Sequence, residues 1–419
     1  MTDTTYIPNL RHLRMVQAIG RLGGVSCASR ELNTSQPAVT QAVANLETEF
    51  GTEIFERCAT GTFPTEQGLR FLLRVDRFFE ILDEALDEVM PRGETQAQNR
   101  RPVERMITGT QIRAMIVTSD PATVAEEAHH LGVLPASLYR SVRTLERALG
   151  RTLFDRSAHG PICNKAGELL NRRFSRACRE IELARAEVAM ASGLGNLEIV
   201  IGALPMAGSF ELAEAIQDFA ALHPSVRVKI VTAPYHALLN DLELAKVDMI
   251  FGLLRQPDWA TGLHEEAMFR DSYCIAMRKG HPLTRMRQVT PADLVRYDWV
   301  VPARGTPRRQ RIAAIFDKAG KTPDFRLETS SLTTIRALLI KSDVITVMTR
   351  SETQLDESLG IIECRPCDSL DALPPKGVTT LADSLPTEAH RAFLDCLRKV
   401  TAQSHHERPG WRPEIALVS

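Results

Sequence analysis

The amino-acid sequence predicts a multidomain protein in which two related all-α units precede one α/β domain. Ten residues of segment 25–68 recur 99 positions later without a gap, as Leu32 and Leu131 or Gly68 and Gly167 illustrate. A register held over that length indicates one folding unit that is built twice. After Gly195 the sequence changes to alternating strand-like and helix-like segments, which is typical of an α/β domain.

The first copy contains a pair of short helices. Ser26 is expected to cap a helix that runs to Leu32, and Thr34 or Ser35 is expected to cap a second helix. Pro37 lies in the first turn of that second helix, where a proline loses no hydrogen bond. Two short helices joined by a tight turn are typical of a helix-turn-helix.

The second helix of this pair has the surface expected of a helix that contacts DNA. Its apolar residues are expected to point inward: Val39, Val43, Leu46 and Phe50. Its outward residues are small, hydroxyl or amide side chains: Gln36, Ala38, Thr40, Gln41, Ala42 and Asn45. Amides can bond adenine in the major groove, threonine can bond a base edge, and alanine can contact a thymine methyl. Ser35, Pro37 and Arg57, which lies beside a predicted β wing, complete the expected DNA contacts.

The same residues carry a resemblance to a known family. The motifs Thr-Ser-Gln-Pro-Ala-Val-Thr at 34–40, Leu46-Glu47, Phe50-Gly51, Phe55-Glu56-Arg57 and Thr-Glu-Gln-Gly at 65–68 resemble the amino-terminal domain of LysR-type transcriptional regulators. The resemblance implies a winged helix-turn-helix that binds double-stranded DNA. The alternative is a small helical adaptor without nucleic acid, but the outward face lacks the apolar residues that an adaptor would bury.

A long amphipathic helix is predicted over residues 65–90. Its apolar stripe is expected to consist of Leu69, Leu72, Leu73, Phe79, Leu82 and Leu86. A helix of about 25 residues extends roughly 37 Å, so it cannot bury that stripe on its own small domain and needs a partner. In the family that the chain resembles, the equivalent helix pairs with its mate in a dimer; packing of its first half on its own domain is the alternative. The first unit thus covers 1–93, and a linker covers 94–108.

The second copy, residues 109–193, diverges from the first. Its helix over 135–149 has lost the Ser-Gln-Pro motif, and its long helix is expected over 165–190. Residues 94–193 hold 15 Lys and Arg against 11 Asp and Glu, whereas residues 1–93 hold 9 against 13. The expected DNA contacts of the second copy are Ser137, Tyr139, Arg140, Arg143, Arg147 and Arg156. Arg140 or Arg143 can bond guanine or neutralise phosphate; the alternative is a degenerate spacer used for dimerisation.

The α/β domain is expected over 194–404, with a polar tail at 405–419. Its predicted strands and helices suggest a mostly parallel sheet and two lobes, joined by crossing segments near 270–276 and 346–349. His223-Pro224 and Gly280-His281-Pro282-Leu283 are similar to parts of the LysR-type effector domain. That resemblance implies a two-lobed domain shaped like periplasmic binding proteins.

A ligand site in such a domain is expected where strands end and helices begin. The candidate residues are Pro205, Met206, Ser209, Thr232, Pro234, Tyr235, Phe251, Gly252, Leu253, Arg304, Thr306, Arg308, Ser330, Ser331 and Thr349. Hydroxyl groups with Arg304 or Arg308 suit a small polar effector such as a carboxylate. The segments 202–205 and 305–308 look like the branch of the family that senses sugars and aromatic acids, although each residue alone is equally compatible with an ordinary loop.

Composition narrows the remaining classes of function. No apolar run approaches the roughly 18 residues of a membrane span, the first residues lack the pattern of a signal peptide, and eight scattered Cys suggest reduced thiols in the cytoplasm. Cys364 and Cys367 have the spacing of a redox pair, but no second pair or nearby His completes a metal site. We therefore predict no cofactor, no metal, no catalytic residues and no membrane partner.

The sequence thus predicts a ligand-responsive transcriptional regulator that is not an enzyme. Its partners are expected to be double-stranded DNA, a small-molecule effector and further copies of itself in a homodimer or homotetramer. Two alternatives stay open at this point. In the first, only the first unit binds DNA and the second serves oligomerisation; in the second, the chain is an enzyme acting on small molecules.

Overall fold

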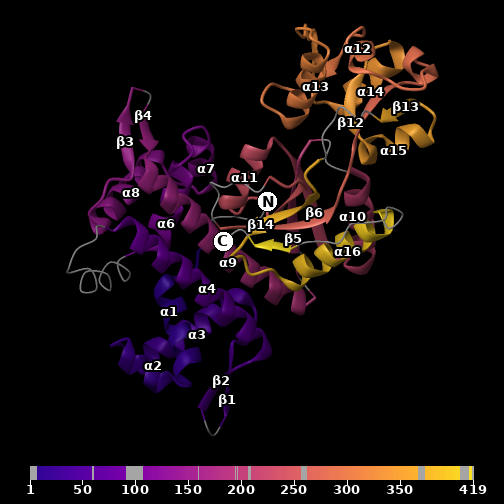
Figure 1. Cartoon of the computed structure of the whole chain (residues 1–419). Helices are drawn as coiled ribbons and strands as arrows, with labels where there is room; N and C mark the ends of the chain where they lie inside the picture. The colour runs from indigo at the N-terminus through magenta and orange to yellow at the C-terminus, as the bar shows by residue number, and fades with distance from the viewer. Residues whose placement is uncertain are drawn as a thin grey trace. The chain divides into compact units, whose positions relative to one another are not determined.

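The computed structural model describes residues 7–58, 61–90, 107–158, 160–193, 195, 197–205, 209–255, 262–366, 373–405 and 415–417. The chain forms two compact units (Figure 1). Unit 1 comprises Met1–Glu198 with Glu243–Lys246, and unit 2 comprises Ile199–Leu242 with Val247–Ser419. The predicted linker at 94–108 lies outside the described residues apart from its last two.

Unit 1 contains the same succession of elements twice: three helices, a two-stranded hairpin and a long helix. The first succession is α1 (Leu10–Leu22), α2 (Val25–Glu31), α3 (Gln36–Phe50), β1 (Phe55–Cys58), β2 (Gly61–Pro64) and α4 (Glu66–Val89). The second is α6 (Gly109–Thr118), α7 (Val124–His130), α8 (Pro135–Leu149), β3 (Phe154–Ser157), β4 (Gly160–Cys163) and α9 (Lys165–Ala191). Both hairpins are antiparallel pairs.

Local chemistry explains where the helices begin and end. The Ser35 hydroxyl accepts the Ala38 N–H at 3.3 Å and caps α3, as predicted. Gly51 ends α3 and Gly150 ends α8, both in the left-handed conformation that glycine adopts without strain. The expected cap at Ser26 is wrong, because α2 already begins at Val25, after Gly24, and has no side-chain cap.

One carboxylate in each half holds the hairpin against the preceding helix. Glu47 Oε1 accepts the backbone N–H groups of Ile54 at 2.9 Å and Phe55 at 3.2 Å. Glu146 Oε1 accepts the N–H groups of Leu153 at 2.7 Å and Phe154 at 3.3 Å. Because these N–H groups precede or open a strand, the carboxylate supplies the acceptor that the sheet does not.

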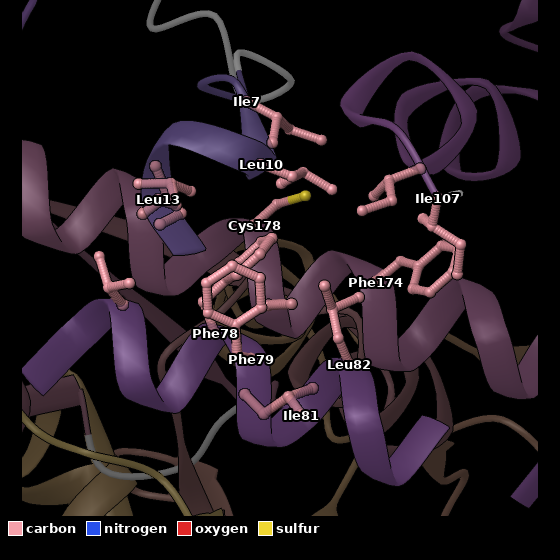
Figure 2. Packing of buried hydrophobic residues seen from close by; sticks show 14 of the residues in the cluster. Ile7, Leu10, Leu13, Phe78, Phe79, Ile81, Leu82, Ile107, Phe174 and Cys178 are labelled. Atoms are coloured by element: carbon pink, nitrogen blue, oxygen red, sulfur yellow. The ribbon is translucent and has the colours of Figure 1, made fainter. Parts of the chain in front are cut away.

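The long helices α4 and α9 pack along each other within this one chain. Their buried faces join one hydrophobic core that includes Phe78, Phe79, Ile81 and Leu82 of α4 and Phe174 of α9 (Figure 2). The partner that α4 needs is therefore α9. The predicted stripe is partly wrong: Leu69 and Leu73 are exposed, whereas Phe71, Val75 and Phe78 are buried. The difference arises because α9 covers a face of α4 that the apolar spacing alone does not define.

Unit 2 contains a larger six-stranded sheet in the order β15-β8-β14-β7-β5-β6. Its elements are β5 (Leu197–Ala203), α10 (Ser209–Leu222), β6 (Val226–Thr232), α11 (Tyr235–Glu243), β7 (Met249–Leu253), β8 (Leu263–Phe269), β14 (Lys376–Leu381), α16 (Glu388–His405) and β15 (Ile415–Leu417). β5 and β7 are parallel, but β14 is antiparallel to both β7 and β8. The expectation of a mostly parallel sheet is corrected to a mixed one, since β14 enters from the second lobe rather than through a crossover helix.

A second lobe lies between β8 and β14 in the chain. Its elements are β9 (Tyr273–Arg278), a 3-10 turn η1 (Pro282–Arg285), α12 (Pro291–Leu294), β10 (Val300–Val301), α13 (Pro307–Lys318), β11 (Leu327–Glu328), α14 (Leu332–Lys341), β12 (Thr346–Thr349), α15 (Arg350–Ser358) and β13 (Ile362–Pro366). β12 and β13 flank β9 in an antiparallel sheet, and β10 pairs with β11 in parallel.

The crossings between the lobes differ in part from the prediction. The first lies between β8 and β9, at residues 270–272; the other residues of the predicted segment 270–276 belong to β9. The second is not at 346–349, because that segment is β12 inside the sheet of the second lobe. The chain returns to the larger sheet between β13 and β14, after Pro366 and before Lys376.

The sequence pattern did not indicate β8 or α15, and it did not indicate β15 in the tail. β8 carries the charged stretch His264-Glu265-Glu266, which hides its strand pattern, and α15 is a polar helix. β15 pairs with β8 within the segment that was expected to be a polar tail. Across the described parts of the chain, none of the helices combines the length and the apolar character that a membrane crossing requires.

Replacement of Gly68 tests the contact between α4 and the strand entry. A Cβ at Gly68 would lie 1.9 Å from the Ile54 carbonyl oxygen, so we expect Gly68→Ala to lower the free energy of unfolding by about 1–3 kcal/mol. Gly24→Ala is the control, since nothing lies within 4 Å of a Cβ there and its φ of −179° is extended. Urea unfolding measures both variants. Equal stability of the two would contradict the packing described here.

Candidate functional site

The exposed surface of α3 matches the predicted DNA-contacting face with one exception. Ser35, Gln36, Pro37, Gln41 and Asn45 are exposed, and Ala38 and Thr40 are half-buried. Gln41 Nε2 donates to Asn45 Oδ1 at 2.9 Å, so the two amides form one polar surface. Ala42, which was expected to point outward, is buried, because it follows Val39 and precedes Leu46 on the inward face.

The surface of α8 is basic where that of α3 is neutral. Arg140, Arg143 and Arg147 are exposed, and Ser137 and Tyr139 are half-buried. The Ser137 hydroxyl donates to the Leu134 carbonyl at 2.6 Å, so it completes the turn that begins the helix.

Two of the predicted arginines of the second half differ in how they are held. Arg147 donates from Nε to the Arg143 carbonyl at 3.3 Å and from Nη2 to Thr144 Oγ1 at 3.1 Å, which holds its side chain against α8. Arg156 is exposed on β3. Its counterpart Arg57 lies on β1 opposite Thr62, and its side chain is outside the described residues.

In the larger lobe of unit 2, the predicted effector residues divide into exposed and buried groups. Pro205, Thr232 and Pro234 are exposed after β5 and β6, whereas Phe251 and Gly252 are buried within β7 and Leu253 is half-buried. The full burial of Phe251 is explained by core packing. Ser209 is the first residue of α10, and Met206 lies outside the described residues.

Tyr235, at the start of α11, is a buried polar side chain with an unused hydroxyl. Only 6% of the residue is exposed, and its Oη has no hydrogen-bond partner among the described residues. The Arg255 guanidinium lies 4.4 Å from the centre of its ring. Burial raises the pKa of the Tyr235 phenol, so the hydroxyl stays protonated and available as a donor.

In the smaller lobe, hydroxyl residues begin two helices. Thr306 Oγ1 accepts the Arg309 N–H at 3.3 Å and begins α13, while Ser331 Oγ accepts the Thr334 N–H at 3.4 Å and begins α14. Arg304 and Ser330 are exposed beside them. Arg308 is already engaged, since its guanidinium donates to Glu352 Oε1 at 2.6 Å. The cation that was expected to bind a ligand carboxylate is thus already paired with a carboxylate of the protein.

Thr349 belongs to a buried polar cluster around Lys376, which the sequence analysis did not find. Lys376 Nζ donates to Asp271 Oδ2 at 2.7 Å, to Ser351 Oγ at 2.7 Å and to Thr349 Oγ1 at 3.1 Å. Lys376 and Asp271 have side chains that are 1% exposed. Asp271 lies in the first crossing and Lys376 begins β14 at the end of the second, so one ion pair connects both crossings.

The ionisation of Asp271 follows from this geometry. Burial by itself would raise the pKa of this carboxyl, but the charge and hydrogen bond of Lys376, with further bonds from Ser351 and the Ser272 N–H, lower the pKa to about 2. The only sequence signal of the cluster is a lysine that opens an otherwise uncharged strand, Lys-Gly-Val-Thr-Thr-Leu. Within the described residues no three His, Cys, Asp or Glu side chains gather in a way that would hold a metal.

A helix-turn-helix unit followed by a two-lobed α/β domain defines the class of ligand-responsive transcriptional regulators. Residues 192–402 match the family model "LysR substrate binding domain", and residues 10–69 match "Bacterial regulatory helix-turn-helix protein, lysR family". The chain therefore belongs to the LysR family and is a DNA-binding transcriptional regulator with an effector-binding domain. Residues 70–191 lie outside both matches.

Relatives agree with this assignment. The chain is 28% identical to the HTH-type transcriptional regulator GalR of Pseudomonas putida over 95% of this chain and 98% of that protein. It is 24% identical to PcaQ of Agrobacterium fabrum over 72% of this chain and 97% of that protein, so this chain is the longer of the two. A full-length OxyR structure from Pseudomonas aeruginosa has the same fold over 70% of this chain and 94% of its own, with a TM-score of 0.50 and 19% identity. GalR and PcaQ are named as transcriptional regulators, which agrees with the prediction that the protein is not an enzyme.

Removal of one partner from the Lys376 cluster is expected to lower the free energy of unfolding. Lys376→Met leaves the Asp271 carboxylate buried without its cation, so we expect a loss of about 3–5 kcal/mol in the free energy of unfolding. Lys321→Met, at an exposed lysine, is the control and should change it by less than about 0.5 kcal/mol. The double variant Lys376→Met/Asp271→Asn should recover part of the loss; additive losses would contradict the pairing.

The pH dependence of stability is a separate test of Asp271. Its lowered pKa means that the folded state favours the ionised carboxylate, so this contribution is fully present above the ordinary carboxyl pKa of about 3.9. It is lost as the pH falls from there toward about 2. Thermal unfolding between pH 6 and pH 2 should show a smaller acid-dependent loss in Asp271→Asn than in the wild type. An unchanged pH profile in this variant would exclude the assigned ion pair.

Proposed function

We propose that this regulator contacts duplex DNA through two winged helix-turn-helix units and responds to a small polar metabolite, a sugar or an aromatic or organic acid. The observation that carries the proposal is the repeated framework of α1–α4 in α6–α9, with polar residues exposed on α3 and cationic residues exposed on α8. A helix of this kind enters the major groove, and its exposed side chains contact base edges and phosphates.

Support for the first unit comes from its hydrogen-bonding chemistry. Gln36, Gln41 and Asn45 present amides without a cation, and an amide pairs in a bidentate way with adenine. Support for the second unit comes from charge, because Arg140 and Arg143 are exposed on α8. A guanidinium bonds guanine or a phosphate. The alternative, in which the second unit serves only oligomerisation, does not account for this basic surface.

The effector is proposed to bind in unit 2 through hydroxyl groups and the exposed guanidinium of Arg304. Thr306 and Ser331 begin helices, where backbone N–H groups favour an anion, and the exposed Arg304 lies in the same loop as Thr306. Tyr235 offers a buried hydroxyl without a described partner. The lobes are proposed to close on the effector and so change how subunits of a homodimer or homotetramer engage DNA in the cytoplasm.

Removing two arginines tests DNA contact by the second unit. We expect Arg140→Ala/Arg143→Ala to weaken binding to duplex DNA and to reduce the slope of log affinity against log salt concentration by about two, because each cation brought to the duplex, at a base edge or at a phosphate, displaces about one counterion. Arg285→Ala/Arg287→Ala, at exposed arginines of unit 2, is the matched control. Fluorescence anisotropy over a salt series measures both variants. An unchanged slope in the α8 variant would favour the oligomerisation alternative.

Tyr235→Phe tests the effector site without disturbing the fold. Its hydroxyl has no described partner, so its removal should leave the melting temperature within about one degree. Loss of one hydrogen bond to a bound effector should weaken the affinity roughly tenfold. Calorimetric titration with a panel of aromatic carboxylates and sugars provides the measurement, with Tyr297→Phe as the control. Equal affinities of the wild type and Tyr235→Phe for a ligand from this panel would remove Tyr235 from the site.

A further inference from the structure

The two halves of unit 1 make one ion pair in both directions, each time between equivalent residues of the repeat. We infer that a single chain supplies a complete two-armed DNA-binding surface, with α3 on one arm of the operator and α8 on the other. Because the exposed faces of α3 and α8 differ, the two arms are not copies of one sequence: the arm under α3 is rich in A·T pairs, and the arm under α8 contains guanine. This inference rests on the proposed function, in which both helices contact DNA.

The ion pairs between α4 and α9 are the first evidence of a two-fold arrangement. Arg74 of α4 donates from Nε to Glu187 of α9 at 2.9 Å, and Arg173 of α9 pairs with Glu88 of α4. Arg74 and Arg173 are 99 positions apart, and so are Glu88 and Glu187. An arginine of each half thus binds the equivalent glutamate of the other half. Such an exchange of equivalent contacts is the signature of an isologous, two-fold interface.

The ends of α3 and α8 each contact the long helix of the opposite half, through residues that are not equivalent in the repeat. Arg185 of α9 pairs with Glu49 of α3 at 3.2 Å and lies over the ring of Phe50 at 4.9 Å. Arg151, which follows α8, donates to the carbonyl of Val89 at the end of α4 at 2.8 Å. Each long helix therefore supports the DNA-contacting helix of the opposite half.

The starts of the two halves also meet. Asn9 caps α1 and Thr108 caps α6, again 99 positions apart. A Cβ at Gly109 would lie 3.2 Å from the Cβ of Ile7, so the two starts are in close contact. Arg14 and Arg113, which are also equivalent positions, line one cavity between them. Figure 2 shows Ile7 and Ile107 on the same side of the shared core.

The interface is too deeply buried to be a loose association. Arg74 is 2% exposed and is held by Glu180 at 2.8 Å as well as by Glu187. Phe78, Phe79 and Phe174 join one core with residues of both halves. In Figure 1 the β1–β2 and β3–β4 hairpins lie at opposite ends of unit 1, with α4 and α9 between them. A two-fold pair of helix-turn-helix units is the geometry that binds two half-sites on one duplex.

The difference between the arms follows from the side chains. Gln36, Gln41 and Asn45 on α3 select for adenine, whereas Arg140 and Arg143 on α8 select for guanine. Because α3 and α8 present different side chains, we expect the two half-sites that one chain binds not to form a palindrome.

Selection of binding sites from a random duplex library by the full-length chain tests this inference. We expect one pair of unlike arms for each chain bound to the selected duplex. Gln41→Ala should reduce base discrimination roughly tenfold in one arm alone, and Arg143→Ala should do so in the other arm alone. A palindrome in which Gln41→Ala affects both arms and Arg143→Ala affects neither would overturn the inference while leaving DNA binding intact. If no duplex were retained at low salt, the proposed function itself would fail.

Crosslinking tests whether the two halves pair within one chain. Glu84→Cys/Arg173→Cys places two thiols where a 3.0 Å ion pair now lies across α4 and α9. Unlabelled and ¹⁵N-labelled chains are mixed, unfolded together and refolded before reaction with a short bismaleimide, and the linked peptides are mapped by mass. We expect only light–light and heavy–heavy pairs between positions 84 and 173. If half of the linked pairs were light–heavy, as random pairing between chains predicts, the two halves would pair between chains and the inference would be overturned. Single-cysteine variants are the controls for reaction at native thiols.

Discussion

The pairing of the two halves of unit 1 depends on the ion pairs of the buried Arg74 guanidinium. Burial by itself would lower the pKa of this group, but hydrogen bonds and charge from Glu187 and Glu180 outweigh it and raise the pKa. The ion pair does not have to contribute much net stability to matter. A guanidinium that must face both carboxylates allows one register between α4 and α9, and the remaining contacts between the halves follow from that register.

The repeat retains its framework and diverges at its surface. Glu47 and Glu146 hold their hairpins in the same way, and Gly68 and Gly167 both lie against a backbone carbonyl where a Cβ would not fit. These positions stabilise the fold of each half. The exposed residues of α3 and α8 are not needed for the fold. They differ between the halves: those of α3 are rich in amides, and those of α8 are rich in arginine. Similar folds therefore present different side chains on their surfaces.

In unit 2 the polar cluster of Lys376, Asp271, Ser351 and Thr349 stands where the chain passes between lobes. Hydrogen bonds satisfy the ammonium and carboxylate, which makes their burial tolerable. Asp271 lies in the first crossing and Lys376 at the end of the second, so their ion pair holds the two crossings together. The hydroxyls of Thr306 and Ser331 and the buried phenol of Tyr235 lie on elements to either side of these crossings in the sequence.

The sequence by itself determined the local structure of this protein. The 99-residue repeat can be read directly from the sequence. The cap at Ser35 and the bounds of α8 follow from short windows, because caps, turns and helical periodicity depend on neighbours a few residues away. The tertiary structure alone decided that α9 of the same chain covers α4, that Leu69 and Leu73 stay exposed, and that the second crossing follows β13. It also decided that Arg308 is paired with Glu352 and that Lys376 is buried on Asp271, 105 residues away. Such contacts join residues that no short window contains, since burial and charge pairing are set by which distant surfaces come together.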